Sequence, residues 1–371
     1  MFSFTENVET ASNMKRTLQR AWQNHGVLAC LLWPLSQLYR QLMSWRCQAY
    51  RSGFLHSTKT GVPVLVVGNV VVGGAGKTPL VVALVRHLQQ RGVAVGVVSR
   101  GYGRVGQSCL EVYEHTPARQ SGDEPALIKR VTKVPVFVAK NRVDAAHALL
   151  VAYPQTQLLV CDDGLQHYAL ARDVEIAVFD DRGVGNGWLL PAGPLREPWP
   201  ERLRRGIDLV LHSGQSPAFS GFTSSRQLAD YALDCDGRQV PLDSLKGQTL
   251  IALAAIAHPD AFFQMLVTSG LVLSQTISLP DHYDFSDYQL CVGNGCTVLC
   301  TEKDAVKLFE LSGMASIRLL AVPLRFSPEP AFLTAVDALL APLLHQVSPS
   351  HHGHKTARNT GLPSHQRPPG L

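Results

Sequence analysis

The sequence predicts an α/β protein in which helices sandwich a parallel β-sheet, followed by a second, smaller α/β lobe. Apolar segments of strand length alternate with amphipathic segments of helix length from residue 62 onward, which is typical of a parallel sheet covered on both faces. A second alternating series begins near residue 248. The length of 371 residues exceeds what one hydrophobic core usually serves, and 46% of the residues are hydrophobic. We therefore expect two folded lobes.

The first lobe is assigned to residues 56–211. The expected elements are strands at 62–68, 93–98, 134–138, 157–161 and 174–180, and helices at 77–91, near 123–131 and at 141–152.

The remaining boundaries follow changes in composition. Residues 212–247 are rich in Ser, Gly, Gln and Asp and are predicted to be a linker or hairpin. Residues 248–345 are assigned to the smaller lobe, and residues 346–371 lack apolar periodicity and are predicted to be disordered. The elements expected in the smaller lobe are strands at 249–255, 271–277, 297–300 and 317–322, and helices at 259–270 and 303–312.

Residues 1–55 are predicted to form a helical region that associates with a membrane surface. After Pro34, apolar residues recur at helical spacing and arginines fall largely on the other side, which indicates a basic amphipathic helix. The apolar run from Val27 to Leu35 is far shorter than the ~20 residues needed to cross a bilayer. The alternative is that this apolar stripe packs on the protein core, and the sequence leaves both interpretations open.

Positive charge is concentrated near the amino terminus. The formal net charge is +5, yet residues 10–110 contain twelve Lys and Arg and no Asp or Glu. Nucleic acid is not expected as a partner, because no RNP-type, zinc-finger or helix-turn-helix pattern accompanies these charges. An anionic membrane surface or a phosphorylated substrate fits better.

The segment from Val64 to Thr78 is an apolar strand, a glycine-rich turn and the start of a helix. Glycines allow backbone N–H groups to turn toward phosphate oxygens, the helix N-terminus adds positive potential, Lys77 can reach the β- and γ-phosphates, and Thr78 can bind Mg²⁺. Val71 departs from the usual glycine at the first position of the pattern. The segment predicts a P-loop NTPase-like fold and a nucleoside triphosphate ligand, without indicating the reaction.

Further polar clusters follow other predicted strands. Asp162 and Asp163 end the strand at 157–161, at the edge where α/β sheets bind ligands, and aspartates there commonly hold the Mg²⁺ of a nucleotide. In the smaller lobe, the clusters 280–283 and 301–304 provide carboxylates, an imidazole and a lysine for acid–base chemistry.

Taken in order, these motifs resemble the tetraacyldisaccharide 4'-kinase (lipid A 4'-kinase) family of Gram-negative bacteria. The resemblance covers about residues 25 to 340 and therefore rests on an ordered set of motifs. These are Leu-Leu-Trp-Pro-Leu-Ser-x-Leu-Tyr at 31–39, Gly68-Asn69, Gly73-Gly74-x-Gly-Lys-Thr-Pro79, Ser99-Arg-Gly-Tyr-Gly, Gly122-Asp-Glu-Pro, Asp162-Asp-Gly-Leu-Gln-His, Gly187-Trp through Pro194-Leu-Arg-Glu197, Asp281-His282 and Thr301-Glu-Lys-Asp304.

The resemblance implies transfer of the γ-phosphate of ATP, with Mg²⁺, to the 4'-hydroxyl of a tetraacylated glucosamine disaccharide 1-phosphate. It also implies a peripheral location at the cytoplasmic face of the bacterial inner membrane, and no protein partner is predicted. The site residues that it implies are Asp123 and His282 as the catalytic base, Gly73, Gly74, Ala75, Gly76, Lys77, Thr78 and Pro79 for the nucleotide, Thr78, Asp162 and Asp163 for the metal, and Arg100, Gln166, His167, Arg196 and Glu197 in the substrate cleft.

Two alternatives remain at this point. His258 is a second candidate imidazole, although His282 has the Asp281 neighbour that matches the family motif. A membrane-surface P-loop switch ATPase or metallochaperone would use the same nucleotide chemistry for partner control. Such proteins resemble Lys-Gly-Gly-x-Gly-Lys-Thr, and the valine at position 72 of this chain counts against them.

Overall fold

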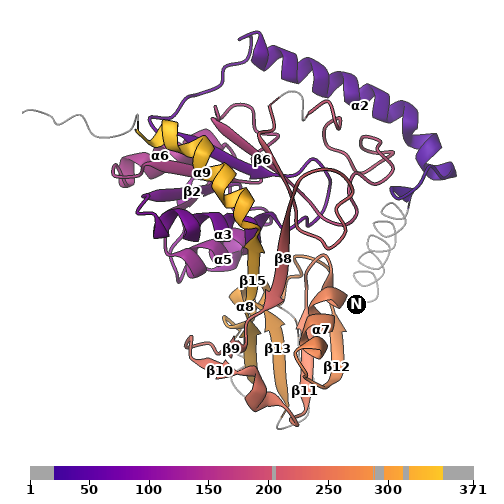
Figure 1. The fold of residues 1–371 in the computed structure, drawn as a ribbon, viewed down its shortest axis with the longest axis vertical. Helices are drawn as coiled ribbons and strands as arrows, with labels where there is room; N and C mark the ends of the chain where they lie inside the picture. The colour runs from indigo at the N-terminus through magenta and orange to yellow at the C-terminus, as the bar shows by residue number, and fades with distance from the viewer. Residues whose placement is uncertain (1–20, 203–205, 287, 289–295, 312–316, 346–371) are drawn as a thin grey trace, which may run out of the picture.

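The computed structural model places the two lobes one above the other, with the long helix α2 (Val27–Arg51) along the outer edge of the larger lobe (Figure 1). The predicted disordered tail and the first 20 residues lie outside the described part of the chain. The structure describes residues 21–202, 206–286, 288, 296–311 and 317–345.

The larger lobe is built on a nine-stranded sheet. From one edge to the other, the strands are β15 (Leu324–Pro328), β8 (Phe222–Leu228), β7 (Leu209–His212), β6 (Val174–Phe179), β1 (Val64–Gly68), β5 (Leu158–Asp162), β2 (Val95–Ser99), β4 (Val136–Val138) and β3 (Leu110–Glu111). All neighbours pair in parallel except the two edge pairs, β15 with β8 and β4 with β3. The predicted parallel α/β sheet is confirmed.

Helices cover both faces of this sheet. Successive strand residues point to opposite faces, so Leu65 and Val67 belong to one core and Val64 and Val66 to the other. The first core includes residues of α3 (Lys77–Gln90), α5 (Asp123–Thr132) and α9 (Pro330–His345). The second includes residues of α6 (Arg142–Ala152) and of the loop between β6 and β7, on which α2 packs. The short helix α4 (Ala118–Ser121) precedes α5.

The smaller lobe is a six-stranded sheet with a helix on each face. α7 (Pro259–Thr268) packs with Leu250 and Ala252, whereas α8 (Glu302–Leu308) packs with the alternate residues Ile251 and Leu253. A short 3-10 helix, η2 (Leu242–Leu245), joins the α7 side. The strand order is β10 (Gln239–Pro241), β9 (Tyr231–Leu233), β14 (Arg318–Val322), β13 (Thr297–Thr301), β11 (Leu250–Ala254) and β12 (Leu273–Ser278).

The lobes are joined by β8 and β15, which pair antiparallel and which we call the connecting ribbon. β8 leads from the larger sheet into β9, and β14 leads back into β15 across Pro323 (Figure 1). α9 then returns to the larger lobe, where Phe332 and Val336 are fully buried in its core. From the sequence we predicted a linker where β8 lies, and we did not predict β7, β15 or α9. The larger lobe therefore contains segments that precede the smaller lobe in the chain and segments that follow it.

The predicted N-terminal helix is present as α2, with Pro34 inside it. Its buried residues are Ala29, Ser36 and Ala49, whereas large apolar side chains remain exposed along it, among them Leu31 at 72% and Trp45 at 66%. None of the described helices combines the length and the hydropathy that a membrane-crossing segment needs. The location of α2 at a membrane surface stays a prediction.

Candidate active site

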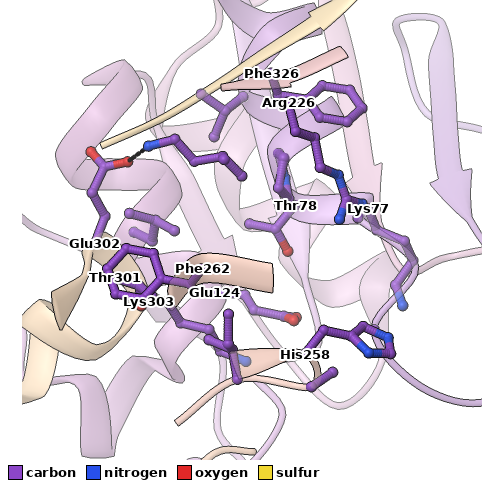
Figure 2. Close-up of a pocket in the computed structure, with 18 of the residues that line it drawn as sticks. Lys77, Thr78, Glu124, Arg226, His258, Phe262, Thr301, Glu302, Lys303 and Phe326 are labelled. Carbon is purple, nitrogen blue, oxygen red and sulfur yellow. Dashed lines mark hydrogen bonds between the residues drawn. The ribbon is translucent and has the colours of Figure 1, made fainter. Parts of the chain in front are cut away.

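A cleft of 2330 Å³ lies where the larger lobe, the connecting ribbon and the smaller lobe meet. Figure 2 shows Lys77 and Thr78 at the start of α3, with Arg226 reaching in from the ribbon and Lys303 and His258 entering from the smaller lobe. The cleft is therefore at the carboxyl edge of the larger sheet, where ligands of open α/β sheets bind.

The loop between β1 and α3 has the backbone of a phosphate cradle. Gly73 and Gly76 have φ angles of 110° and 82°, which side-chain-bearing residues rarely adopt, and Gly76 is the N-cap of α3. A Cβ at Gly68, where the loop leaves β1, would lie 2.7 Å from Leu165 Cγ. The N-terminus of α3 lines the cleft, and its N–H groups, which have no partner within the helix, together with its positive potential suit an anion there.

Lys77 is held within this cradle and is only 8% exposed. Its Nζ lies 3.4 Å from Asn69 Oδ1 and 3.6 Å from Asp163 Oδ1. Asn69 Nδ2 in turn donates to the Gly73 carbonyl at 3.2 Å. Asn69 therefore links Lys77 to the glycine-rich loop and helps to position it.

The two aspartates after β5 have opposite environments. Asp162 is fully buried, and neither of its carboxylate oxygens has a hydrogen-bond partner among the described residues. Burial, reinforced by Glu124, raises the pKa of Asp162 well above its usual value. Burial would also raise the pKa of Asp163, but Lys77 and Arg196 lower it below the usual value.

The residues present fit a magnesium ion. Asp162 lies opposite Val67 in the β1–β5 pairing, directly before the phosphate cradle, and its unpartnered carboxylate needs a positive charge. No group of three or more His, Cys, Asp or Glu side chains in the described ranges is placed to hold a metal alone. Mg²⁺ in nucleotide sites usually takes one or two carboxylates together with phosphate oxygens and water, which agrees with this sparse set.

Asp123 and His282 meet across the boundary between the lobes. Asp123 is the first residue of α5, and its Oδ2 lies 3.1 Å from His282 Nδ1 and 2.8 Å from Lys307 Nζ. Burial would raise the pKa of Asp123, but the hydrogen bonds from His282 and Lys307 lower it below the usual value. His282 also contacts the Tyr102 ring edge-on at 5.3 Å.

Charged side chains lie near the second ring nitrogen of His282. Its Nε2 lies 3.4 Å from Lys303 Nζ, which donates to Asp281 Oδ1 at 2.8 Å. The structure describes three non-glycine residues with positive φ, and Asp163 and His282 are two of them, which places unusual backbone at this site. The alternative imidazole, His258, instead lies 3.7 Å from Asp180 and does not pair with Asp123.

Of the five residues predicted for the substrate cleft, the structure places Arg196 in the cleft wall. Within the described residues, the other four are not among those that line it. Gln166 links two of the others: its Nε2 donates to Glu197 Oε1 at 2.9 Å, and its Oε1 accepts from Arg196 Nη1 at 3.4 Å. Arg100 is exposed beyond the end of β2.

His167 contacts the start of α6. Its Nε2 accepts from the Arg142 N–H at 3.2 Å. Burial, together with Arg142 and Arg172, lowers the pKa of His167 to about 4, so the ring is neutral at physiological pH. This geometry orders the loop after Asp163, because the Arg142 side chain also donates to the Asp163 carbonyl at 2.9 Å.

Sequence reasoning missed Arg226, Arg182 and Lys307. Lys307 could have been found, because it lies four residues after Lys303 on α8 and so shares a helix face with it. Arg182 approaches the phosphate cradle, where its guanidinium lies 3.4 Å from the Gly74 carbonyl. Arg226 belongs to a segment without motif and becomes part of the site only through the connecting ribbon.

Comparison with known proteins identifies relatives over most of the chain. A family model described as tetraacyldisaccharide-1-P 4'-kinase matches residues 28–341. A tetraacyldisaccharide 4'-kinase from Polaromonas sp. strain JS666 is 67% identical, covering 91% of this chain and all of the relative. One from Acidovorax ebreus is 53% identical over 90% and 96% of the two chains. The crystal structure of LpxK from Aquifex aeolicus in complex with ATP aligns with a TM-score of 0.73 at 31% identity, covering 84% of this chain and 99% of that one.

The environments of Asp162 and Asp163 predict different dependences of stability on pH. The folded-state pKa of Asp162 is raised, so its stabilising contribution is present below about pH 4 and is lost as the pH rises. In metal-free protein, the melting temperature of Asp162→Asn relative to the wild type should therefore increase with pH above about 4. The pKa of Asp163 is lowered, so its contribution is lost only as the pH falls below about 4.

Differential scanning fluorimetry in EDTA measures both trends. The difference between Asp163→Asn and the wild type should stay constant between about pH 5 and pH 8 and shrink only under more acidic conditions. The same trend in both variants would contradict the assignment of opposite environments.

Proposed function

The chain belongs to the tetraacyldisaccharide-1-P 4'-kinase family, and from this membership we propose how its residues perform the reaction. The protein is an ATP-using kinase that phosphorylates the 4'-position of a tetraacyldisaccharide in lipid A biosynthesis. One observation supports this function above the others: the phosphate cradle and His282 line the same cleft, so a nucleotide and a base can meet there. The switch ATPase or metallochaperone is not favoured.

The nucleotide phosphates would lie over Gly73 to Thr78, with Lys77 reaching the β- and γ-phosphates. Asp162, Asp163 and Thr78 would hold Mg²⁺, which when bound neutralises charge on the phosphates. Arg196 of the cleft wall pairs with Asp163 at 3.2 Å and so fixes this carboxylate beside Lys77.

The acceptor is proposed to be the tetraacylated glucosamine disaccharide 1-phosphate, with its 4'-hydroxyl at the Asp123–His282 pair. The hydroxyl proton passes to the pair while the 4'-oxygen forms a bond to the γ-phosphorus. The bond from that phosphorus to the bridging oxygen breaks, and ADP leaves with the electron pair. The hydrogen bonds from His282 and Lys307 lower the pKa of Asp123 and so weaken it as a base, so we assign the proton to the pair rather than to the carboxylate alone.

Transfer of label from γ-labelled ATP tests the function directly. With tetraacyl disaccharide 1-phosphate, purified protein should give a labelled lipid product, and Lys77→Ala should give none because it removes the cation at the β- and γ-phosphates. The variant should melt like the wild type if the role of Lys77 is catalytic. Acceptor-independent ATP hydrolysis without a labelled lipid would instead favour a switch ATPase.

A double-mutant cycle tests the coupled base. Asp123→Ala should lower kcat by about 10²–10⁴-fold with little change in the KM for ATP, and His282→Ala somewhat less. If the two residues act as a unit, the double variant should be hardly worse than Asp123→Ala alone. His258→Ala is the matched control, because this imidazole lines the same cleft but lies beside Asp180. Multiplicative losses in the cycle would contradict the pair.

The exposed apolar face of α2 is proposed to rest on the anionic, cytoplasmic surface of the bacterial inner membrane. Leu31, Leu35 and Leu42 are 72%, 54% and 58% exposed and recur at helical spacing. The basic residues of the same region would attract anionic lipid.

Replacing these three leucines by serine should release the protein from anionic vesicles and raise the KM for the lipid more than that for ATP. The control is Gln41→Ser with Gln48→Ser, two exposed positions of the same helix. Circular dichroism and melting should be unchanged in both variants. Loss of folding in the leucine variant would support packing on the protein core instead.

A further inference from the structure

We propose that Arg226 binds the phosphate chain of the nucleotide, as a ligand supplied by the connecting ribbon. The proposal rests on the nucleotide site described above and adds a residue outside every motif of the sequence. Arg226 lines the cleft, and Figure 2 shows its side chain running from the ribbon toward the start of α3. A Cβ at Gly76 would collide with its Nη2, so the guanidinium lies directly against the phosphate cradle.

The guanidinium is held in place by the cradle itself. Its Nη2 donates to Ser213 Oγ at 2.7 Å, and Ser213 Oγ donates to the Ala75 carbonyl at 2.7 Å. Phe326, its cross-strand partner on β15, lies under the guanidinium, with 5.9 Å between Cζ and the ring centroid. The side chain is therefore ordered before any ligand arrives, which lowers the entropic cost of binding one.

The charge of Arg226 has no counter-ion in the described part of the chain. No carboxylate there forms an ion pair with it, and its Nε is buried without a hydrogen-bond partner. Burial lowers the pKa of Arg226, and the more distant Asp180 and Asp181 offset this only in part. Asp180 is already engaged by Arg182, whose Nη2 lies 2.6 Å from its Oδ2.

Positive charge and positive potential also lie at the same cradle. They come from Lys77 and the N-terminus of α3, so an additional part-buried cation is unfavourable unless an anion binds. A phosphate has the charge and the acceptor oxygens that suit the donors of a guanidinium. Nucleotide phosphates bound over Gly76 would lie next to Arg226 and supply this anion.

A purely structural role makes a different prediction. If Arg226 only braced Ser213 and Phe326, its loss would lower stability and leave nucleotide affinity in the folded protein unchanged. The readouts are therefore the Kd values for ADP and a non-hydrolysable ATP analogue by calorimetry, the KM values, and the melting temperature without nucleotide.

Arg226→Gln should raise the Kd for ADP and for the ATP analogue by about 10- to 100-fold, which corresponds to a loss of ~1.4–2.8 kcal/mol of binding free energy. The KM for ATP should rise while the KM for the lipid acceptor stays the same. Arg226→Lys should lie between, since an ammonium keeps the charge without the planar fork of donors. Arg325→Gln is the matched control, because this arginine is on the same ribbon but pairs with Asp230 at 2.5 Å and should leave both Kd values unchanged.

Wild-type Kd values in folded Arg226→Gln, or an equal loss in Arg325→Gln, would overturn the proposal. If Arg226→Gln does not fold, Arg226→Lys decides: a Kd for ADP at least about threefold weaker supports phosphate binding, and wild-type affinity refutes it. Failure of the wild type itself to bind either nucleotide would instead refute the nucleotide site on which the proposal rests.

Discussion

The contact on which the site depends is the one that Asp123 makes with the smaller lobe. Asp123 is the first residue of α5 in the larger lobe, yet its carboxylate bonds to His282 and Lys307, which both belong to the smaller lobe. The two lobes must therefore pack together for the Asp123–His282 hydrogen bond to form. The chain enters the smaller lobe through β8 and leaves it through β15, after which α9 packs in the core of the larger lobe.

Around the cradle, the protein keeps one acidic and one basic side chain without a counter-ion among the residues described. Asp162 has no hydrogen bond to either oxygen, and Arg226 has an unpartnered Nε and no carboxylate beside it, among the residues described. Each arrangement is costly on its own. A nucleotide bound with Mg²⁺ brings a cation for the first and phosphate oxygens for the second, so one ligand would relieve both costs. The affinity for the nucleotide would therefore depend on the electrostatic cost of the free site.

The sequence predicted the elements that bear local signals. The P-loop and the strand ending at Asp162 follow from glycine spacing, apolar runs and the carboxyl-edge rule. The pairing of Asp123 with His282 could not come from spacing, because 159 residues separate them; it came from resemblance to a family, and the structure brings the two side chains together. Arg226 and α9 were missed because their roles arise from packing between segments far apart in the chain. The position of His167 outside the cleft depends equally on a tertiary contact, with Arg142.

We propose above all that the Asp123–His282 pair receives the proton of the acceptor hydroxyl. A crystal structure of the complex with a non-hydrolysable ATP analogue, Mg²⁺ and the tetraacyl disaccharide 1-phosphate tests it most directly. We expect the 4'-oxygen within hydrogen-bond reach of this pair, about 2.6–3.2 Å, and in line with the γ-phosphorus. A 4'-oxygen placed away from both side chains, with another group in contact with it, would contradict the claim.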